Sequence, residues 1–274
     1  MLESYYIVSS LPEIEWDSDI PYTTTMFLAD NESALQHFRK NINDIIMLND
    51  LYNLESFLRV KMAEYITGVQ KSKEAKEAEF REPCLLDKES MIELIESPED
   101  LPDFVIDYLK ENYDIGARYQ NIESLYISYF EYLRQNESLF LQDYGDLESK
   151  LRTVIAALRI RKKGLKLDEK LSGHDEIKQH ILSNFNVPDF DVKALFPEIE
   201  YLLDIFEEEP ITREKGIDKI RYDYLHQMTF ENPFVEKTIY SFILRLMILE
   251  RWVNVDEIRG REIISSIVKG GTSS

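Results

Sequence analysis

The sequence predicts an all-α protein, on three observations. Apolar residues recur at intervals of three and four through most of the 274 residues, which is the spacing of an amphipathic helix. Glycine and proline are scarce, at nine each, and this disfavours an all-β chain with many tight turns. Only the β-branched and aromatic stretch Tyr5–Ser10 is typical of a strand. This stretch is either a short strand or an extended arm, so we expect at most a minor strand at the N-terminus.

The first part of the chain predicts two helices, over roughly residues 31–48 and 50–67. Their apolar positions are Ile42, Ile45, Ile46, Leu51, Leu54, Leu58 and Met62. The charged stretch Lys71–Glu82 that follows is either a solvated helix or a flexible connector. It marks a boundary after the first helical part.

The middle of the chain resumes helical spacing over residues 90–96 and 102–113. The next segment, Asn121–Phe140, is rich in aromatic side chains, and we interpret its apolar stripe as core rather than as a ligand site. The stripe consists of Leu125, Tyr129, Tyr132 and Leu133. A short break is expected at residues 143–145 before the next helix.

That next helix, Asp146–Gly164, is the one strongly basic segment in a chain with a formal net charge of -20. Its cations crowd toward the C-terminal end, where they oppose the negative end of the helix dipole, and Gly164 is predicted to stop the helix. Two interpretations stay open: a core helix whose cations pair with the chain's own acids, or a contact surface for an acidic partner. The candidate partner-binding residues are Arg159, Arg161, Lys162 and Lys163.

The last third of the chain predicts helices over residues 198–209 and 212–228, then a longer helix that begins at Asn232 and Pro233. This longer helix carries two apolar stripes, and a helix that is apolar on two faces is buried. We therefore expect Phe242 and Leu246 to lie in the core. Residues 256–268 predict a last helix, and the small polar tail 270–274 is expected to be disordered.

Motifs for catalysis or cofactor binding are absent from the sequence. It contains no glycine-rich phosphate loop, and its four histidines form no HxxxH or HExxH pair. Asp223 and His226 make a single D-x-x-H, whereas a di-iron bundle needs two. Cys84 is the single cysteine, so no internal disulfide and no multi-cysteine zinc site can form. We expect no catalytic residue, no cofactor and no metal.

Composition limits the partners and the location. With 52 acidic against 32 basic residues the surface repels phosphate, so we expect no nucleic-acid binding. The most apolar run, Ile239–Leu249, is interrupted by Arg245 and is shorter than the ~20 residues that span a membrane. The N-terminus lacks the basic region of a signal peptide. These features favour a soluble, cytoplasmic protein.

Several stretches together resemble a bacterial family encoded beside V-type ATPase genes, regarded as the counterpart of the C subunit of archaeal-type ATPases, called d in eukaryotic enzymes. The resemblance spans nearly the whole chain in the right order, and three motifs carry it. The first is the basic helix end, Leu158–Gly164. The second is a segment that begins with Arg-Glu and ends with Ile-Asp, which here is R-E-K-G-I-D, and the third is a closing L-x-I-x-E-R-W segment. Their residues are Arg213, Glu214 and Asp218, and Leu246, Ile248, Glu250, Arg251 and Trp252.

The resemblance implies one funnel-like domain of three related helical units, which we place at residues 1–82, 83–172 and 173–269. Such a subunit sits on the membrane proteolipid ring, receives the foot of the central stalk, and couples ATP hydrolysis to ion movement without binding nucleotide. Its partners are the other ATPase subunits, and it meets the membrane only through the ring. A weak internal repeat agrees, since Asn53–Lys61, Thr153–Arg161 and Ser241–Arg251 are each an apolar helical stripe that closes on cations.

Two other classes of function stay open. One is a free-standing helical adaptor that binds an acidic protein partner through the basic helix. The other is an unrecognised hydrolase that uses scattered carboxylates, because 52 acids allow many chance carboxylate pairs.

Overall fold

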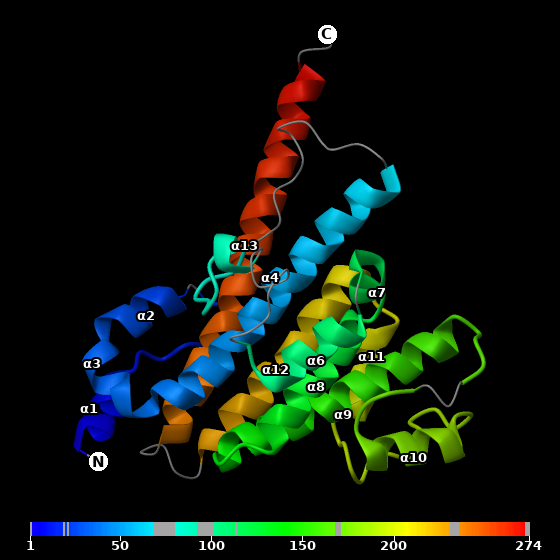
Figure 1. Ribbon diagram of the computed structural model, residues 1–274, viewed down its shortest axis with the longest axis horizontal. Coiled ribbons are helices and arrows are strands. Elements are labelled where there is room, and N and C mark those ends of the chain that lie inside the picture. The colour runs from blue at the N-terminus through cyan, green and yellow to red at the C-terminus, as the bar shows by residue number, and fades with distance from the viewer. Residues whose placement is uncertain are drawn as a thin grey trace. The chain divides into compact units, whose positions relative to one another are not determined.

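The computed structural model describes residues 2–18, 20, 22–67, 80–91, 101–112, 114–167, 171–230 and 236–271, and every regular element in these ranges is a helix (Figure 1). For residues 2–5, 64–67, 254 and 256–271 only the backbone course is described. The all-α prediction is confirmed. The chain divides into two compact units, one made of residues 1–39 and 207–274 and the other of residues 40–206.

The first unit joins the two ends of the chain. Its elements are α1 (Leu2–Ser10), α2 (Thr24–Asp30), α3 (Glu32–Leu35), the 3₁₀ helix η1 (Gln36–Phe38), α12 (Pro210–Phe230) and α13 (Glu236–Gly271). The long helices α12 and α13 run antiparallel, because Asp218 bonds to Trp252 whereas Leu225 bonds to Ser241. The predicted burial is confirmed, since Phe242 is 1% exposed and Leu246 is 0% exposed.

The predicted N-terminal strand is wrong, because residues 2–10 form helix α1. β-Propensity reflects the packing surface more than the backbone itself, and α1 packs on α13 and α3, with Ile7 buried. Its last turn is completed by two serine hydroxyls. Ser9 Oγ donates to the Tyr6 carbonyl at 3.0 Å and Ser10 Oγ donates to the Ile7 carbonyl at 2.8 Å. Tertiary contact therefore decided this element against its local preference.

The second unit is built around the antiparallel pair α8 and α9, on which α6, α7 and α10 pack (Figure 1). Its elements are α4 (Arg39–Thr67, whose first residue belongs to the other unit), α6 (Asp103–Glu111), α7 (Ile115–Gln120), α8 (Ile122–Arg134), α9 (Leu139–Lys162), α10 (Asp175–Asn184) and α11 (Ile199–Phe206). The aromatic stripe of α8 is core at three of its four predicted positions, since Leu125, Tyr129 and Leu133 are fully buried, whereas Tyr132 is half-buried and donates to the Asp44 carboxylate at 2.8 Å. The Tyr129 hydroxyl donates to the Asp44 carbonyl of α4 at 2.8 Å, which fixes α4 on α8.

One predicted boundary, between helices 31–48 and 50–67, does not exist, because α4 runs without interruption through residues 49 and 50. The polar residues Asn49 and Asp50 at the expected boundary are buried and hold a neighbouring segment. Asn49 Nδ2 donates to the Pro83 carbonyl at 2.9 Å, and the Asp50 carboxylate accepts the backbone N–H groups of Leu85 and Leu86. Long-range partners therefore explain these polar residues in mid-helix.

The predicted break at residues 143–145 is also wrong, since α9 begins at Leu139 and continues through Gly145. This glycine allows α8 and α9 to approach closely. A Cβ atom at Gly145 would lie 2.8 Å from the Phe130 carbonyl oxygen and 3.0 Å from the Arg134 amide nitrogen. Gly145 is required by helix packing rather than by a turn.

Some predictions fall outside the described residues. These are most of the charged stretch 71–82, most of the expected helix 90–96, and the start of the long helix at Asn232 and Pro233. Helix α13 takes in residues 256–268 without a break and extends to Gly271, while residues 272–274 lie outside the description. Within the described ranges, no helix combines the length and the apolar character needed to span a membrane.

Candidate functional site

The basic end of α9 has a defined cap. The Leu165 N–H donates to the Ile160 carbonyl at 3.1 Å, and the Gly164 N–H donates to the Arg161 carbonyl at 2.9 Å. These two bonds form a Schellman motif, which needs a residue with left-handed backbone after the helix. Gly164 supplies it, with φ of +63°. The predicted helix stop at Gly164 is confirmed.

Arg161, one of the four candidate partner-binding residues, holds an irregular loop of its own chain. Its guanidinium donates to three carbonyls, those of Phe185 at 2.6 Å, Val187 at 2.7 Å and Pro188 at 2.6 Å. It also stacks on the Phe190 ring, 3.8 Å from the ring centre. Burial lowers the pKa of Arg161.

The loop held by Arg161 contains an unusual backbone conformation. Phe190 and Asp191 have φ of +55° and +57°, and left-handed backbone is rare for an aromatic residue. Such a conformation persists only where the surroundings determine it strongly. Phe190 is fully buried, and Arg161 covers its ring. The arginine therefore shapes residues 185–191 at the end of α9.

The other three candidate residues lie around the same helix end, and all three are exposed. The Lys162 ammonium lies 3.5 Å from the Phe206 carbonyl oxygen and 5.5 Å from the centre of the Phe206 ring. Arg159 and Lys163 stand on the last turn and at the C-cap. The four cations thus differ in role, because the described contacts of Arg161 and Lys162 are with carbonyls and rings.

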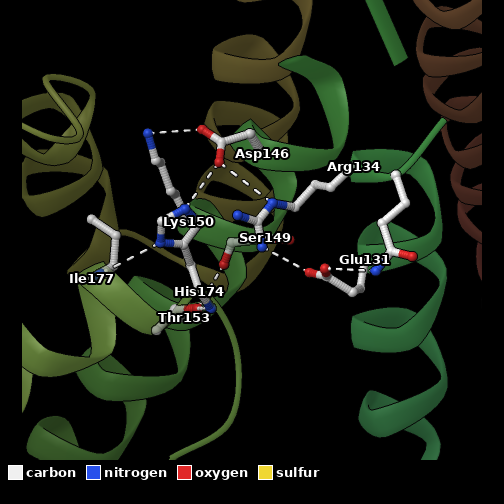
Figure 2. Close-up of polar contacts among 9 residues, drawn as sticks. Glu131, Arg134, Asp146, Ser149, Lys150, Thr153, His174 and Ile177 are labelled. Atoms are coloured by element: carbon white, nitrogen blue, oxygen red, sulfur yellow. Dashed lines mark hydrogen bonds and ion pairs between the residues drawn. The ribbon is translucent and has the colours of Figure 1, made fainter. Parts of the chain in front are cut away.

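A second polar cluster, which sequence reasoning missed, centres on Asp146 in the first third of α9 (Figure 2). Its carboxylate lies 2.9 Å from His174 Nε2, 2.8 Å from Lys150 Nζ and 3.6 Å from Arg134 Nε. Burial alone would raise the pKa of Asp146, but the hydrogen bonds from His174 and Lys150 outweigh it and lower the pKa to about 2. Asp146 is therefore a carboxylate shared by three cationic or hydrogen-bonding side chains.

His174 connects this carboxylate to the start of α10. As N-cap residue it accepts the Ile177 N–H through Nδ1 at 3.5 Å, so the ring proton is assigned to Nε2, which faces Asp146. A histidine–carboxylate pair can activate a nucleophile when the other ring nitrogen is available. Here that nitrogen serves as a helix cap, so the pair acts as a joint between helices.

The chain just before His174 lies directly against α9. The His174 N–H donates to Thr153 Oγ1 at 2.9 Å, and Thr153 Oγ1 in turn donates to the Ser149 carbonyl at 2.6 Å. A Cβ atom at Gly173 would lie 2.0 Å from Thr153 Oγ1, and φ at Gly173 is +130°. Only glycine permits this approach. Helix α10 is thus fixed to α9 at its start by His174 and Thr153, and just beyond its end by Arg161.

A third polar cluster joins α12 and α13 in the first unit. The Asp218 carboxylate is 2% exposed and accepts hydrogen bonds from Arg221 at 2.8 Å, Arg251 at 2.6 Å and the Trp252 indole at 2.9 Å. Glu214 adds a longer ion pair, 3.8 Å from Arg251. A buried carboxylate with this many donors is well compensated.

The neighbouring Glu250 attaches α2 to the same helix. Its two carboxylate oxygens accept the Thr24 N–H at 2.7 Å and the Thr24 hydroxyl at 2.6 Å, at the first residue of α2. Burial raises the pKa of Glu250. The E-R-W triplet therefore binds α2 through its glutamate and α12 through its arginine and tryptophan. Two motifs noted in the sequence thus meet in one place.

The other residues that could ligate a metal or act as a nucleophile are spread over the described chain. In the part of the chain that is described, no three His, Cys, Asp or Glu side chains are grouped as metal ligands would be. Asp223 of the D-x-x-H pair forms an ion pair with Lys219. Burial, with nearby acids such as Asp50, raises the pKa of Cys84 to about 11, which disfavours the reactive thiolate.

The fold and these clusters define an all-helical protein in which buried charges join one helix to the next. The chain belongs to the DUF2764 family, a protein family of unknown function, whose model matches residues 1–271. No curated protein and no solved structure matches the chain.

Proposed function

We propose that this protein is a non-catalytic subunit of a V/A-type ATPase, which links the central stalk to the membrane proteolipid ring and couples ATP turnover to ion transport. The resemblance in sequence motifs supports the proposal. One structural observation supports it further: the R-E-K-G-I-D segment, Arg213–Asp218, and the L-x-I-x-E-R-W motif meet at Asp218. If the two motifs belong to one structural feature of the family that the sequence resembles, their residues are expected to contact each other, as these do.

The funnel of three related units is part of this proposal. The three weakly repeated segments, Asn53–Lys61, Thr153–Arg161 and Ser241–Arg251, lie in α4, α9 and α13. These are the three longest described helices, with 29, 24 and 36 residues. One long helix in each of the expected units 1–82, 83–172 and 173–269 suits the expected plan.

A linker between stalk and ring needs a fixed geometry rather than a reaction centre. Buried polar networks whose members are all bonded favour one packing arrangement over its alternatives. The buried Asp218 cluster supplies such a fixed joint in the first unit, and the half-buried Asp146 cluster joins helices in the second. In the proposed role the protein is cytoplasmic and is held at the inner membrane through the ring.

A free-standing adaptor for an acidic protein is the alternative function. The exposed cations Arg159 and Lys163 at the end of α9 favour it, because most of this acidic chain would repel such a partner. The two functions differ in one respect, which is whether the partner belongs to the ATPase.

The proposal is tested by tagging the native protein and purifying it from detergent-solubilised membranes. We expect stalk and proteolipid subunits to copurify, and we expect deletion of the gene to abolish ATP-driven ion uptake by membrane vesicles. The control is a strain that lacks the ring subunit, in which the tagged protein should leave the membrane fraction. Normal ion uptake without the gene would refute the proposal, and capture of a partner from outside the ATPase would favour the adaptor.

A further inference from the structure

We infer that the end of α9 is a docking surface for an acidic protein segment that also carries an apolar side chain, and that Arg161 positions this surface. The inference rests on the proposed function, because it takes the segment to belong to an ATPase subunit. It differs from the sequence-based interpretation by adding two apolar contact residues, Leu165 and Val187, and by giving Arg161 a different role.

The two apolar residues are exposed at the same helix end. Leu165 is 56% exposed and Val187 is 39% exposed. Leu165 is attached to the last turn of α9 by its N–H bond to the Ile160 carbonyl, and Val187 is attached by the bond from Arg161 to its carbonyl. Ile160 and Arg161, which are consecutive in α9, therefore fix the backbone of Leu165 and Val187 respectively. The side chains of Leu165 and Val187 are exposed and can contact a partner.

Basic side chains lie close to Leu165 in the sequence. Lys163 and Lys166 are exposed two residues before and one residue after Leu165, and Arg159 is exposed six residues before it. The chain as a whole carries a formal net charge of -20, so an acidic segment is repelled by most of its surface and attracted here. An apolar contact with a surrounding rim of charge is the usual composition of a protein interface.

The described contacts of Arg161 are with backbone carbonyls and a ring of its own chain. Three backbone carbonyls and the Phe190 ring occupy its guanidinium. Its donors are consequently used to hold residues 185–188 of its own chain, and its effect on a partner passes through the position of Val187. Arg161 is a positioning residue, whereas Arg159, Lys163 and Lys166 are contact residues.

The experiment measures binding of the purified full chain to membranes from the deletion strain, which retain the rest of the ATPase. Leu165→Ser and Val187→Ser should each weaken binding about tenfold, since each removes an apolar contact. Lys163→Glu should slow association about tenfold at low salt and less at high salt. Leu139→Ser, at the exposed start of the same helix, and Lys110→Glu, on α6, are matched controls that should bind as wild type does.

Arg161→Lys separates positioning from contact. It keeps the charge but loses the planar fork that reaches three carbonyls. We expect weaker binding with the wild-type dependence on salt, whereas a contact role would leave binding almost unchanged. Far-UV circular dichroism checks the fold, and if this variant does not fold, the exposed Leu165 and Val187 variants still decide the inference.

The partner is identified with a photo-crosslinking amino acid at position 165. A crosslink to an acidic segment of an ATPase subunit supports the inference, and a crosslink to lipid, to a second copy of this chain or to a basic segment overturns it. Wild-type levels of binding by the Leu165, Val187 and Lys163 variants would also overturn it while leaving the proposed function intact. Failure of the wild-type chain itself to bind the membranes would refute the proposed function and this surface together.

Discussion

Asp218 of α12 and Trp252 of α13 are joined by a buried hydrogen bond of 2.9 Å from the indole Nε1 to the carboxylate. The same carboxylate accepts bonds from Arg221 and Arg251, so one acidic group compensates two buried or half-buried cations. Loss of either side leaves charge without a partner in a poorly solvated place. The α12–α13 pair is therefore expected to depend strongly on Asp218.

Asp218→Asn is therefore expected to destabilise the protein by about 3–5 kcal/mol, because it leaves two arginines without their buried counter-charge. Urea unfolding followed by circular dichroism measures the change in the free energy of unfolding. Asp223→Asn on the same helix is the control, because its ion pair with Lys219 is exposed and should contribute at most about 1 kcal/mol. Equal effects of the two substitutions would contradict the assignment.

Leu246→Ala is expected to cost about 2–5 kcal/mol, from lost transfer energy and from the cavity left behind. Leu246 is fully buried, and Phe242, four residues earlier on the same helix, is 1% exposed. Val253→Ala on the same helix is the control, since Val253 is 38% exposed. A cost below about half a kcal/mol for Leu246→Ala would place this side of α13 outside the core.

Gly145→Ala should destabilise the protein by about 1–3 kcal/mol, although alanine is the better helix former in isolation. The added methyl would meet backbone atoms of α8 at 2.8 and 3.0 Å, and backbone cannot move aside as a flexible side chain can. The thermal midpoint measures the effect. A rise in the midpoint would show that helix propensity outweighs the close contact of α8 and α9.

Asp50 predicts a dependence of stability on pH. Burial raises its pKa from 3.8 to about 6, against the lowering effect of the hydrogen bonds from Leu86 and Leu85. The folded state therefore holds the proton more tightly than the unfolded state. The protonated Asp50 carboxyl therefore contributes most to the free energy of unfolding below about pH 4. This contribution falls by about 3 kcal/mol in total as the pH rises through about 6.

Asp50→Asn removes this titration. The free energy of unfolding of the wild type, relative to that of the variant, should fall by up to about 3 kcal/mol between pH 4 and pH 7. Urea unfolding at four or five pH values measures this difference, in which contributions from other groups cancel. Parallel pH profiles for the two proteins would mean that the pKa of Asp50 is the same in both states.

The sequence by itself determined the fold class and many local features. Helical periodicity, the left-handed stop at Gly164, the core stripe of α8 and the burial of Phe242 and Leu246 were all predictable. They depend on residues within one or two turns of each other, and that range is visible in a linear pattern. The partner-binding role of the basic helix end stays a prediction.

Tertiary structure decided the features whose partners are distant. Tyr5–Ser10 became helical on α13 and α3, the polar residues Asn49 and Asp50 turned inward to hold residues 83–86, and Gly145 proved to be a packing residue. His174 and Asp146 are 28 residues apart, Arg161 reaches carbonyls 24 to 27 residues away, and Asp218 bonds to groups 33 and 34 residues away. A side chain with several donors or acceptors has many sterically possible partners, and only the packing of whole helices selects which of them lies within 3 Å.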